Sequence, residues 1–324
     1  MKVKFERALI FVALVALCWG MYGPMLHQSK VGFSGSILYP FLLVCFAYFM
    51  ICSFFIWLLG KFKLASFVKS EGPWPREAII KGLGAGMLGA IGSFGLLLAL
   101  KFYPNPLVVM PIVFGCVEAG NCVATSVIQK RMPERNFLIG ILLLIVGVVV
   151  ALSHKPGAGS AHSGDFHGNL YAMLGCVAII TAAWGSYGSA VHASNVAFKG
   201  QSFRTTMMIG LSYTLCAIPC GLAILANVDG GAVSDVGLHY GFLAGGFTSL
   251  GAIFTVLAIR HVTGGPNTAM PLIFAGAPIV NSFYSIYAQK VPFSDIHILF
   301  WGGVVLCMIG AYIVFASKPT VAHK

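Results

Sequence analysis

Two apolar segments of the chain carry the same aromatic and histidine side chains at the same spacing. The first runs from Trp19 to His27 and the second from Trp184 to His192, and both read Trp-Gly-x-Tyr-Gly-x-x-x-His, 165 residues apart. Indole and phenol rings offer surfaces on which a ligand can stack, and imidazole can exchange a proton near neutral pH. We therefore expect the rings to line a shared cavity and the two histidines to act at its gates, with a structural role for each histidine as the alternative. The ring-bearing candidates are Trp19, Tyr22, Trp184 and Tyr187.

Glu118 is the only acidic residue that falls within a long apolar segment. A lone ionisable group near the centre of a bilayer costs about 2.5–3.5 kcal/mol. Desolvation favours its neutral form, so a proton-binding role is chemically reasonable, and a hydrogen-bonded packing role is the alternative. Asn121 and Thr125 follow Glu118 on the same helical face. The matching stripe in the second half consists of Asn281, Tyr284 and Ser285.

The rest of the chain repeats as well, which indicates an internal duplication. Glycines four residues apart recur in both halves, and small residues at that spacing let helices approach closely in lipid. The offset between the copies stays between 159 and 165 residues, as small loop insertions would produce. The recurring sets include Gly82, Gly86 and Gly92 with Gly241, Gly245 and Gly251; Phe114 and Asn121 with Phe274 and Asn281; and Tyr48 with Tyr213.

The composition predicts a polytopic membrane protein. Hydrophobic residues make up 58% of the 324 residues and charged residues only 9%, whereas soluble domains carry about 25% charge. A helix needs about 20 apolar residues to cross the hydrocarbon core of a bilayer. Ten segments meet this requirement: 8–27, 36–59, 79–100, 105–128, 136–153, 169–192, 203–226, 239–259, 266–288 and 297–316.

The basic residues predict the orientation of these ten helices. If the segments cross in alternation, sixteen lysines and arginines fall on one side of the membrane and four on the other. The positive-inside bias then places both termini in the cytoplasm, in a multi-pass protein of the plasma (inner) membrane. Each half has an odd number of helices, so the two copies enter the membrane from opposite sides. The expected fold class is therefore all-α, with ten transmembrane helices in two inverted five-helix repeats.

Several other functions find no support in the sequence. All nine cysteines lie in apolar segments, so we expect neither a disulfide framework nor a metal site. HExxH, P-loop and GxSxG motifs are absent from the sequence, and we expect no enzymatic activity and no cofactor. The net charge of +11 follows from the topology rather than from a clustered soluble patch, which argues against a nucleic-acid partner. The first apolar segment has a basic start like a secretion signal, but its copy at 169–192 is internal, so we interpret it as the first helix.

The ten predicted helices, the inverted duplication and the Trp-Gly pair in the first helix of each half resemble the drug/metabolite transporter superfamily, especially its EamA-like members. The glycine pairs Gly140 and Gly147, and Gly303 and Gly310, are similar to the repeat ending of that family. The resemblance covers essentially the whole chain. It implies a first five-helix repeat over 1–157, an external linker over 158–168 and a second repeat over 169–324.

The resemblance implies a secondary carrier that moves a small organic metabolite by alternating access. In similar proteins the central cavity lies mainly between the third, fourth, eighth and ninth helices, which would place the stripes of Glu118 and Asn281 beside the tryptophans and tyrosines. A neutral or weakly charged substrate, with proton coupling through Glu118, suits these side chains. A sugar permease of the glucose/ribose porter type is an alternative, and a membrane scaffold or receptor without a transport cycle is another.

Overall fold

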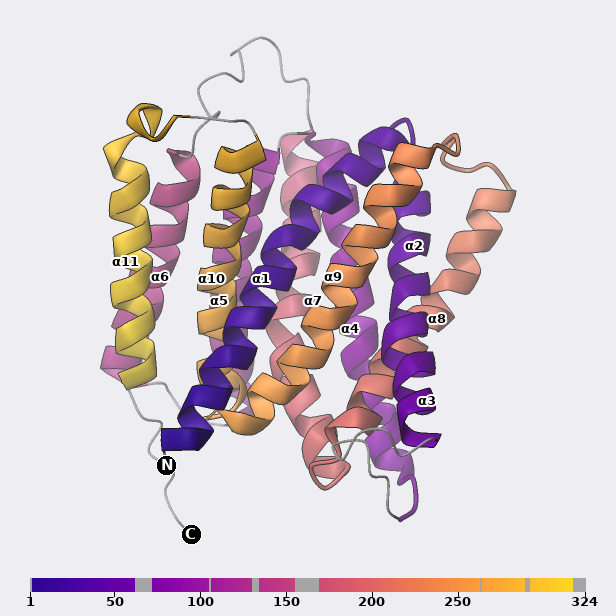
Figure 1. Cartoon of the computed structure of the whole chain (residues 1–324), viewed down its shortest axis with the longest axis horizontal. Helices are drawn as coiled ribbons and strands as arrows, with labels where there is room; N and C mark the ends of the chain where they lie inside the picture. Colours follow the sequence, from indigo (N-terminus) through magenta and orange to yellow (C-terminus); the bar gives the residue numbers. More distant parts are fainter. Residues whose placement is uncertain are drawn as a thin grey trace.

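The computed structural model describes residues 2–61, 72–104, 106–129, 134–154, 169–262, 264–288 and 292–316. Throughout these ranges the regular structure is helical, and the chain forms ten long helical rods (Figure 1). Each rod coincides with one of the ten predicted apolar segments. The rods are α1 (Lys2–Gly32), α2 (Leu38–Tyr48) continued by η1 (Phe49–Phe55) and α3 (Ile56–Lys61), α4 (Arg76–Phe102), α5 (Pro106–Gln129), α6 (Arg135–Ser153), α7 (Leu170–Ala197), α8 (Ser202–Leu225), α9 (Asp235–His261), α10 (Pro266–Ala288) and α11 (Ile298–Ala316).

The helices have the length and the surface of membrane-spanning segments. Six of them, among the described residues, are long and apolar enough to cross a bilayer, with a mean hydropathy between 1.5 and 2.5. Shorter apolar stretches lie within α5, α6 and α11. Large apolar side chains cover the outer faces of the bundle, as a lipid environment favours. Examples are Ile10, Phe54, Val127, Leu215, Leu222 and Met308.

The chain direction alternates from helix to helix. In Figure 1, α1 begins and α11 ends at the same end of the bundle, and α6 ends and α7 begins at the opposite end. This arrangement follows from an even number of rods and matches the predicted crossing pattern. The predicted linker 158–168 lies outside the described residues.

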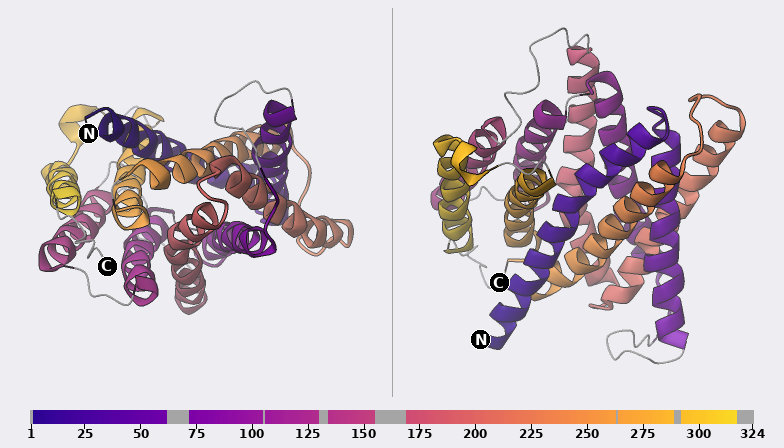
Figure 2. Two further views of the ribbon diagram at one scale, coloured as in Figure 1. Left: turned by 90° about the horizontal axis from the view of Figure 1, so that it is seen from below. Right: turned by 45° about the horizontal axis from the view of Figure 1, so that its top comes forward.

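Helices of the first half pack on helices of the second half. The most extensive contacts are those of α1 with α9, α4 with α7 and α6 with α11, and α1 and α9 run side by side across the bundle in Figure 1. Two further pairs are α5 with α7 and α10 with α1. At one edge of the bundle α6 lies against α11, as both views of Figure 2 show.

Glycines allow these helices to approach one another closely. A Cβ atom added to Gly86 of α4 would lie 2.6 Å from the Cβ of Ser212 in α8. A Cβ atom added to Gly245 of α9 would lie 2.6 Å from the Cβ of Ala47 in α2. The glycine repeats that the sequence analysis identified therefore face the other half of the chain, and a larger residue at these positions would push the helices apart.

Each end of the bundle has a polar contact that joins the two halves. At one end Asp229, in the connection between α8 and α9, lies at the N-terminus of α2. Its Oδ2 atom accepts hydrogen bonds from the Ser36 hydroxyl (2.7 Å) and from the Ile37 and Leu38 amides (2.6 and 3.1 Å). Its Oδ1 atom lies 2.5 Å from the ammonium group of Lys101. The carboxylate therefore links α2, the end of α4 and the α8–α9 connection.

At the other end Arg204, at the start of α8, holds the chain that leads into α4. Its guanidinium donates to the carbonyl oxygens of Pro73 (2.6 Å) and Gly72 (2.9 Å). The same group lies 4.6 Å from the centre of the Trp74 ring, a cation–π distance. Both charged side chains, Asp229 and Arg204, belong to the second half of the chain, and each ties that half to the first.

The contacts of Asp229 predict that part of the free energy of unfolding is lost at low pH. Partial burial on its own would raise the pKa of Asp229, but the hydrogen bonds from Lys101, Ser36, Ile37 and Leu38 hold this pKa at about 2. Because the pKa in the folded protein lies below the ordinary value near 4, the carboxylate stabilises the fold fully above about pH 4. That contribution is lost as the pH falls toward 2.

We expect Asp229→Asn to lower the unfolding free energy at pH 7 by about 1–2 kcal/mol, because a neutral amide loses the charge-assisted bonds. Thermal unfolding in detergent measures the change, and the difference from the wild type should shrink between pH 4 and pH 2. Asp235→Asn, at an exposed position of the first turn of α9, is the matched control and should change stability little. Equal midpoints for the wild type and Asp229→Asn at pH 7 would contradict this account.

Candidate functional site

A cavity rich in aromatic rings lies in the interior of the bundle, where both halves meet. The space between the lining residues, counted together with the opening to solvent, is about 530 Å³. Eight of its lining side chains are aromatic, and none of the described lining residues is charged. The lining consists of Trp19, Tyr22, Tyr48, Gly89, Ser93, Leu96, Phe114, Trp184, Tyr187, Tyr213, Thr248 and Phe274.

The two halves contribute equivalent residues to this lining. Trp19, Tyr22 and Tyr48 of the first half correspond to Trp184, Tyr187 and Tyr213 at the repeat offset of 165 residues. Phe114 corresponds to Phe274 at the offset of 160, and Gly89 to Thr248 at the offset of 159. Ten of the twelve lining residues therefore form five repeat-related pairs.

Glycines in α4 and α9 leave the space that the indole rings of Trp184 and Trp19 occupy. A Cβ atom on Gly92 of α4 would lie 2.7 Å from Cε2 of Trp184, and one on Gly251 of α9 would lie 2.5 Å from Cδ1 of Trp19. Each indole therefore rests on the backbone of a helix from the other half. Trp184 Nε1 also donates a hydrogen bond to the Gly89 carbonyl (3.2 Å). The glycines at these positions are required for the shape of the cavity as well as for helix packing.

Two stacked tyrosines cross between the halves. The rings of Tyr48 and Tyr213 lie 3.7 Å apart at an interplanar angle of 4°. The Tyr48 hydroxyl donates to the carbonyl of Thr248 in α9 (3.1 Å), and the Tyr213 hydroxyl lies 3.2 Å from the Ser93 hydroxyl in α4. Each tyrosine thus bonds to a helix of the half to which it does not belong, and the pair fixes one wall of the cavity.

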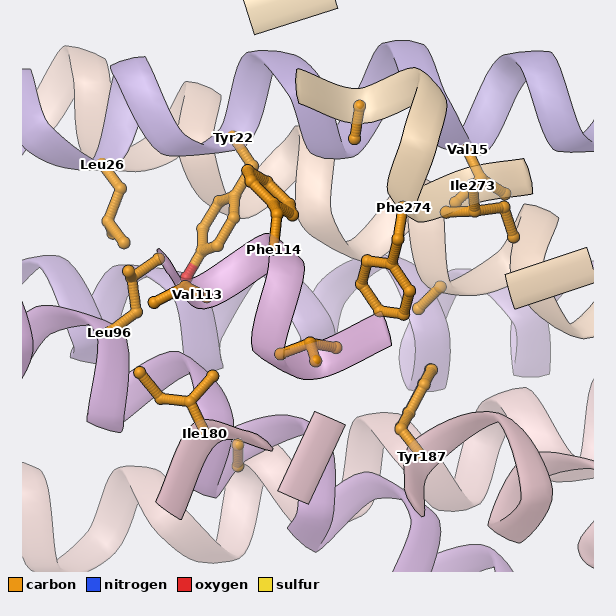
Figure 3. Packing of buried hydrophobic residues seen from close by; sticks show 14 of the residues in the cluster. Val15, Tyr22, Leu26, Leu96, Val113, Phe114, Ile180, Tyr187, Ile273 and Phe274 are labelled. Carbon is orange, nitrogen blue, oxygen red and sulfur yellow. The ribbon is translucent and has the colours of Figure 1, made fainter. Parts of the chain in front are cut away.

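The remaining rings surround the space between α1, α5, α7 and α10. Trp19 is 5.8 Å from Phe274 and 6.2 Å from Tyr187, measured between ring centroids. Figure 3 shows Tyr22, Phe114, Phe274 and Tyr187 in the packed interior between these helices. The Tyr187 hydroxyl is buried and has no hydrogen-bond partner among the described residues. It is available to bind a ligand.

Glu118 lies in a second, smaller pocket rather than in the lining of the central cavity. This pocket has a volume of about 200 Å³ and is bounded by α5, α6 and α10. The side chain of Glu118 is 3% exposed, and neither carboxylate oxygen has a hydrogen-bond partner among the described residues. Phe114 and Phe274 line both pockets. These two rings therefore separate Glu118 from the central cavity.

Three other predicted polar residues, Asn121, Asn281 and Tyr284, are not part of the described lining of the central cavity. Asn121 and Asn281 are buried in the helix interfaces, and Tyr284 is half-buried. The Oδ1 atom of Asn121 has no hydrogen-bond partner among the described residues. Thr125 lies in α5 and Ser285 lies in α10, but the side chains of both fall outside the described part of the structure.

The two histidines lie near opposite ends of the bundle and line neither pocket. His27 is half-buried near the end of α1, and His192 is exposed near the end of α7, beside Gly265.

The described residues contain no group of three His, Cys, Asp or Glu side chains that could hold a metal ion. The lining residues that the sequence analysis did not select are Tyr48, Tyr213, Phe114, Phe274, Gly89, Ser93, Leu96 and Thr248. The first four carried a usable signal, because they recur at the repeat offset.

Comparison with known proteins identifies the fold. No protein-family model and no curated protein matches the chain. A solved structure titled only "Crystal structure of protein" superposes with a TM-score of 0.62 at 17% identity, over 95% of this chain and 96% of that chain. At this identity the likeness shows a shared fold that extends along both chains, and nothing about activity.

The contact between Gly92 and Trp184 predicts a position-specific effect of a single methyl group. We expect Gly92→Ala to lower stability by about 1–3 kcal/mol and to change the tryptophan fluorescence spectrum, because the indole must leave its place on α4. Gly84→Ala is the matched control: Gly84 lies on the same helix, and a Cβ atom there would meet no atom within 4 Å. This control should be neutral or stabilising by up to about 1 kcal/mol. Equal effects of the two variants on thermal unfolding would refute the assigned contact.

Proposed function

We propose that this chain is a secondary carrier that moves a small organic molecule across a membrane by alternating access. The observation that carries the proposal is the central cavity, because its lining consists largely of equivalent residues from the two halves. A binding site shared equally by two halves suits a protein that must offer it to both sides of the membrane in turn. A scaffold or receptor has no comparable need for such a site.

The helix pairing supports an inverted repeat as the basis of this cycle. If the first five rods correspond to the last five, α1 corresponds to α7 and α4 to α9. The pairing of α1 with α9 then has its counterpart in the pairing of α7 with α4. In the same way the pairing of α5 with α7 corresponds to that of α10 with α1. A pseudo-two-fold axis in the membrane plane accounts for this exchange, and carriers with such repeats bind their substrates where the repeats meet.

The fold and the Trp-Gly pair in α1 and α7 are consistent with membership of the drug/metabolite transporter superfamily, with an EamA-like organisation. The lining favours a flat, largely apolar and uncharged substrate with few hydrogen-bonding groups. Eight rings provide stacking surfaces, whereas the polar groups are few and several already bond to the protein. This inventory suits a heterocyclic or aromatic metabolite better than a sugar, which would require a hydrogen-bond partner for each of its hydroxyl groups.

Solute counterflow in proteoliposomes tests the proposed function. We expect vesicles loaded with one member of a panel of nucleobases, aromatic amines, aromatic amino acids and hexoses to accumulate labelled solute of the same kind. Trp184→Ala should raise the half-saturating concentration roughly tenfold, because it removes about 1–2 kcal/mol of ring contact. Trp57→Ala, at an exposed site on α3, is the control and should leave exchange unchanged. Counterflow of hexoses alone, or absence of counterflow for every solute in the panel, would contradict this substrate assignment.

The proposed orientation has both termini in the cytoplasm. A cysteine introduced by Ser160→Cys, in the predicted external linker, should react with a membrane-impermeant maleimide in intact cells. A cysteine introduced by Lys199→Cys, at the turn between α7 and α8, should react only after the membrane is permeabilised. The reverse labelling pattern would overturn the orientation.

A further inference from the structure

We propose that Glu118 is a proton-binding site of the carrier, held apart from the substrate cavity by a wall formed by Phe114 and Phe274. This inference rests on the proposed function and deepens it, because it assigns the coupled ion to a different pocket from the substrate. The inference is drawn from the positions of the two pockets, which meet at Phe114 and Phe274. Among the described lining residues, the two pockets share only these two phenylalanines.

The surroundings of Glu118 favour a protonated carboxyl group. The pocket presents Phe114 and Gly115 from α5, Leu144 and Ile145 from α6, and Pro271, Phe274 and Ala275 from α10. None of these side chains carries a charge or titrates. Burying a carboxylate without a partner is far more costly than burying a neutral acid, so a proton is expected to occupy this group when the pocket is closed.

The helices packed against α5 provide no compensating charge. On α7, Thr181 and Gly185 contact the α5 backbone around Gly120, close to Glu118 in the sequence. Across the phenylalanine wall, the titratable groups of the central cavity are the hydroxyls of its tyrosines. Among the described residues, therefore, no cation is placed to hold Glu118 in its ionised form.

The duplicated sequence explains why one half alone supplies this group. Position 118 corresponds to Pro278 at the offset of 160, and Pro278 lies inside α10. Proline has no amide hydrogen, so the carbonyl oxygen four residues earlier, that of Phe274, loses its helical donor. Phe274 lines the Glu118 pocket. One half thus contributes an acid that can bind a proton, and the other contributes at the equivalent position a proline, whose side chain cannot titrate.

The shared wall gives the proton and the substrate a physical connection. A substrate in the central cavity contacts the same two rings that close the Glu118 pocket. When these rings move, water can reach the carboxyl group, and the ionised form becomes favourable once it is hydrated. Release of the proton then depends on the state of the central cavity, which is the condition for coupling.

Infrared spectroscopy of the protein in lipid tests the site without reference to transport. At pH 7 the wild type should show the C=O stretching band of a protonated carboxylic acid, and Glu118→Gln should lack it. Glu134→Gln, at the exposed N-terminus of α6, is the matched control and should retain the band. A wild type without this band at pH 7 would overturn the proposal, and this measurement stands even if Glu118→Gln fails to fold.

Hydrogen–deuterium exchange of the Glu118 carboxyl proton, followed through the same band, tests whether Phe114 and Phe274 shield this group from water. In D₂O the band should shift slowly in the wild type and faster in Phe274→Ala, with a smaller acceleration in the milder variant Phe274→Leu. Phe283→Ala, at an exposed position of the same helix, should exchange at the rate of the wild type. Equal rates in Phe274→Ala and the wild type would overturn the role of the wall.

Transport assays distinguish a failure of this inference from a failure of the proposed function. Glu118→Gln should retain counterflow and lose accumulation driven by a pH gradient. Accumulation that persists in Glu118→Gln would overturn the coupling role of Glu118. Absence of counterflow in the wild type would instead count against the proposed function, and the infrared band would still decide whether Glu118 binds a proton.

Discussion

The close approach of crossing helices is the constraint on which the rest of the structure depends. In a membrane, hydrophobicity does not drive helices together, so they associate where small residues let their backbones come close. Here α4 and α9 present glycines to the other half, and two of these glycines receive the indoles of Trp184 and Trp19. The same contacts therefore hold the halves together and give the central cavity its shape. A cavity built in this way can be lost when a single methyl group is added to a helix backbone.

The equivalence of the two halves is broken at a few positions, and these positions are where chemistry becomes available. Trp184 donates to a backbone carbonyl, whereas Trp19 Nε1 is buried without a partner among the described residues. Glu118 stands opposite Pro278 in the repeat. A symmetric pair of carboxyl groups at this place would double the cost of burial and would give two proton sites with similar surroundings. One acid and one proline at the equivalent positions leave a single buried carboxyl group.

Much of the fold follows from the sequence, because hydrophobic segments of about 20 residues have few alternatives in a membrane. The ten predicted segments coincide with the ten rods, and six helices among the described residues have the length and apolar composition that crossing a membrane requires. The placement of Trp19, Tyr22, Trp184 and Tyr187 in one cavity was also predictable, since the duplicated motif marks them. The separation of Glu118 from that cavity was not. Residues 114 and 118 lie one helical turn apart, and only the packing of α6 and α10 shows that Phe114 lines both pockets whereas Glu118 lines the smaller one alone. The roles of Tyr48 and Tyr213 depend likewise on the contact between α2 and α8, which no local pattern encodes.

The central claim is that two equivalent halves move against each other so that the cavity opens at either end. Distances between pairs of spin labels in lipid nanodiscs test it directly. One pair, at Val31 and Phe102, lies at the end of the bundle that contains Asp229, and its repeat-related pair, at Val196 and His261, lies at the opposite end. As the pH is varied, the account predicts two distances for each pair, with the long distance at one end gaining population as the long distance at the other end loses it. A single fixed distance for both pairs, or a simultaneous lengthening at both ends, would contradict alternating access.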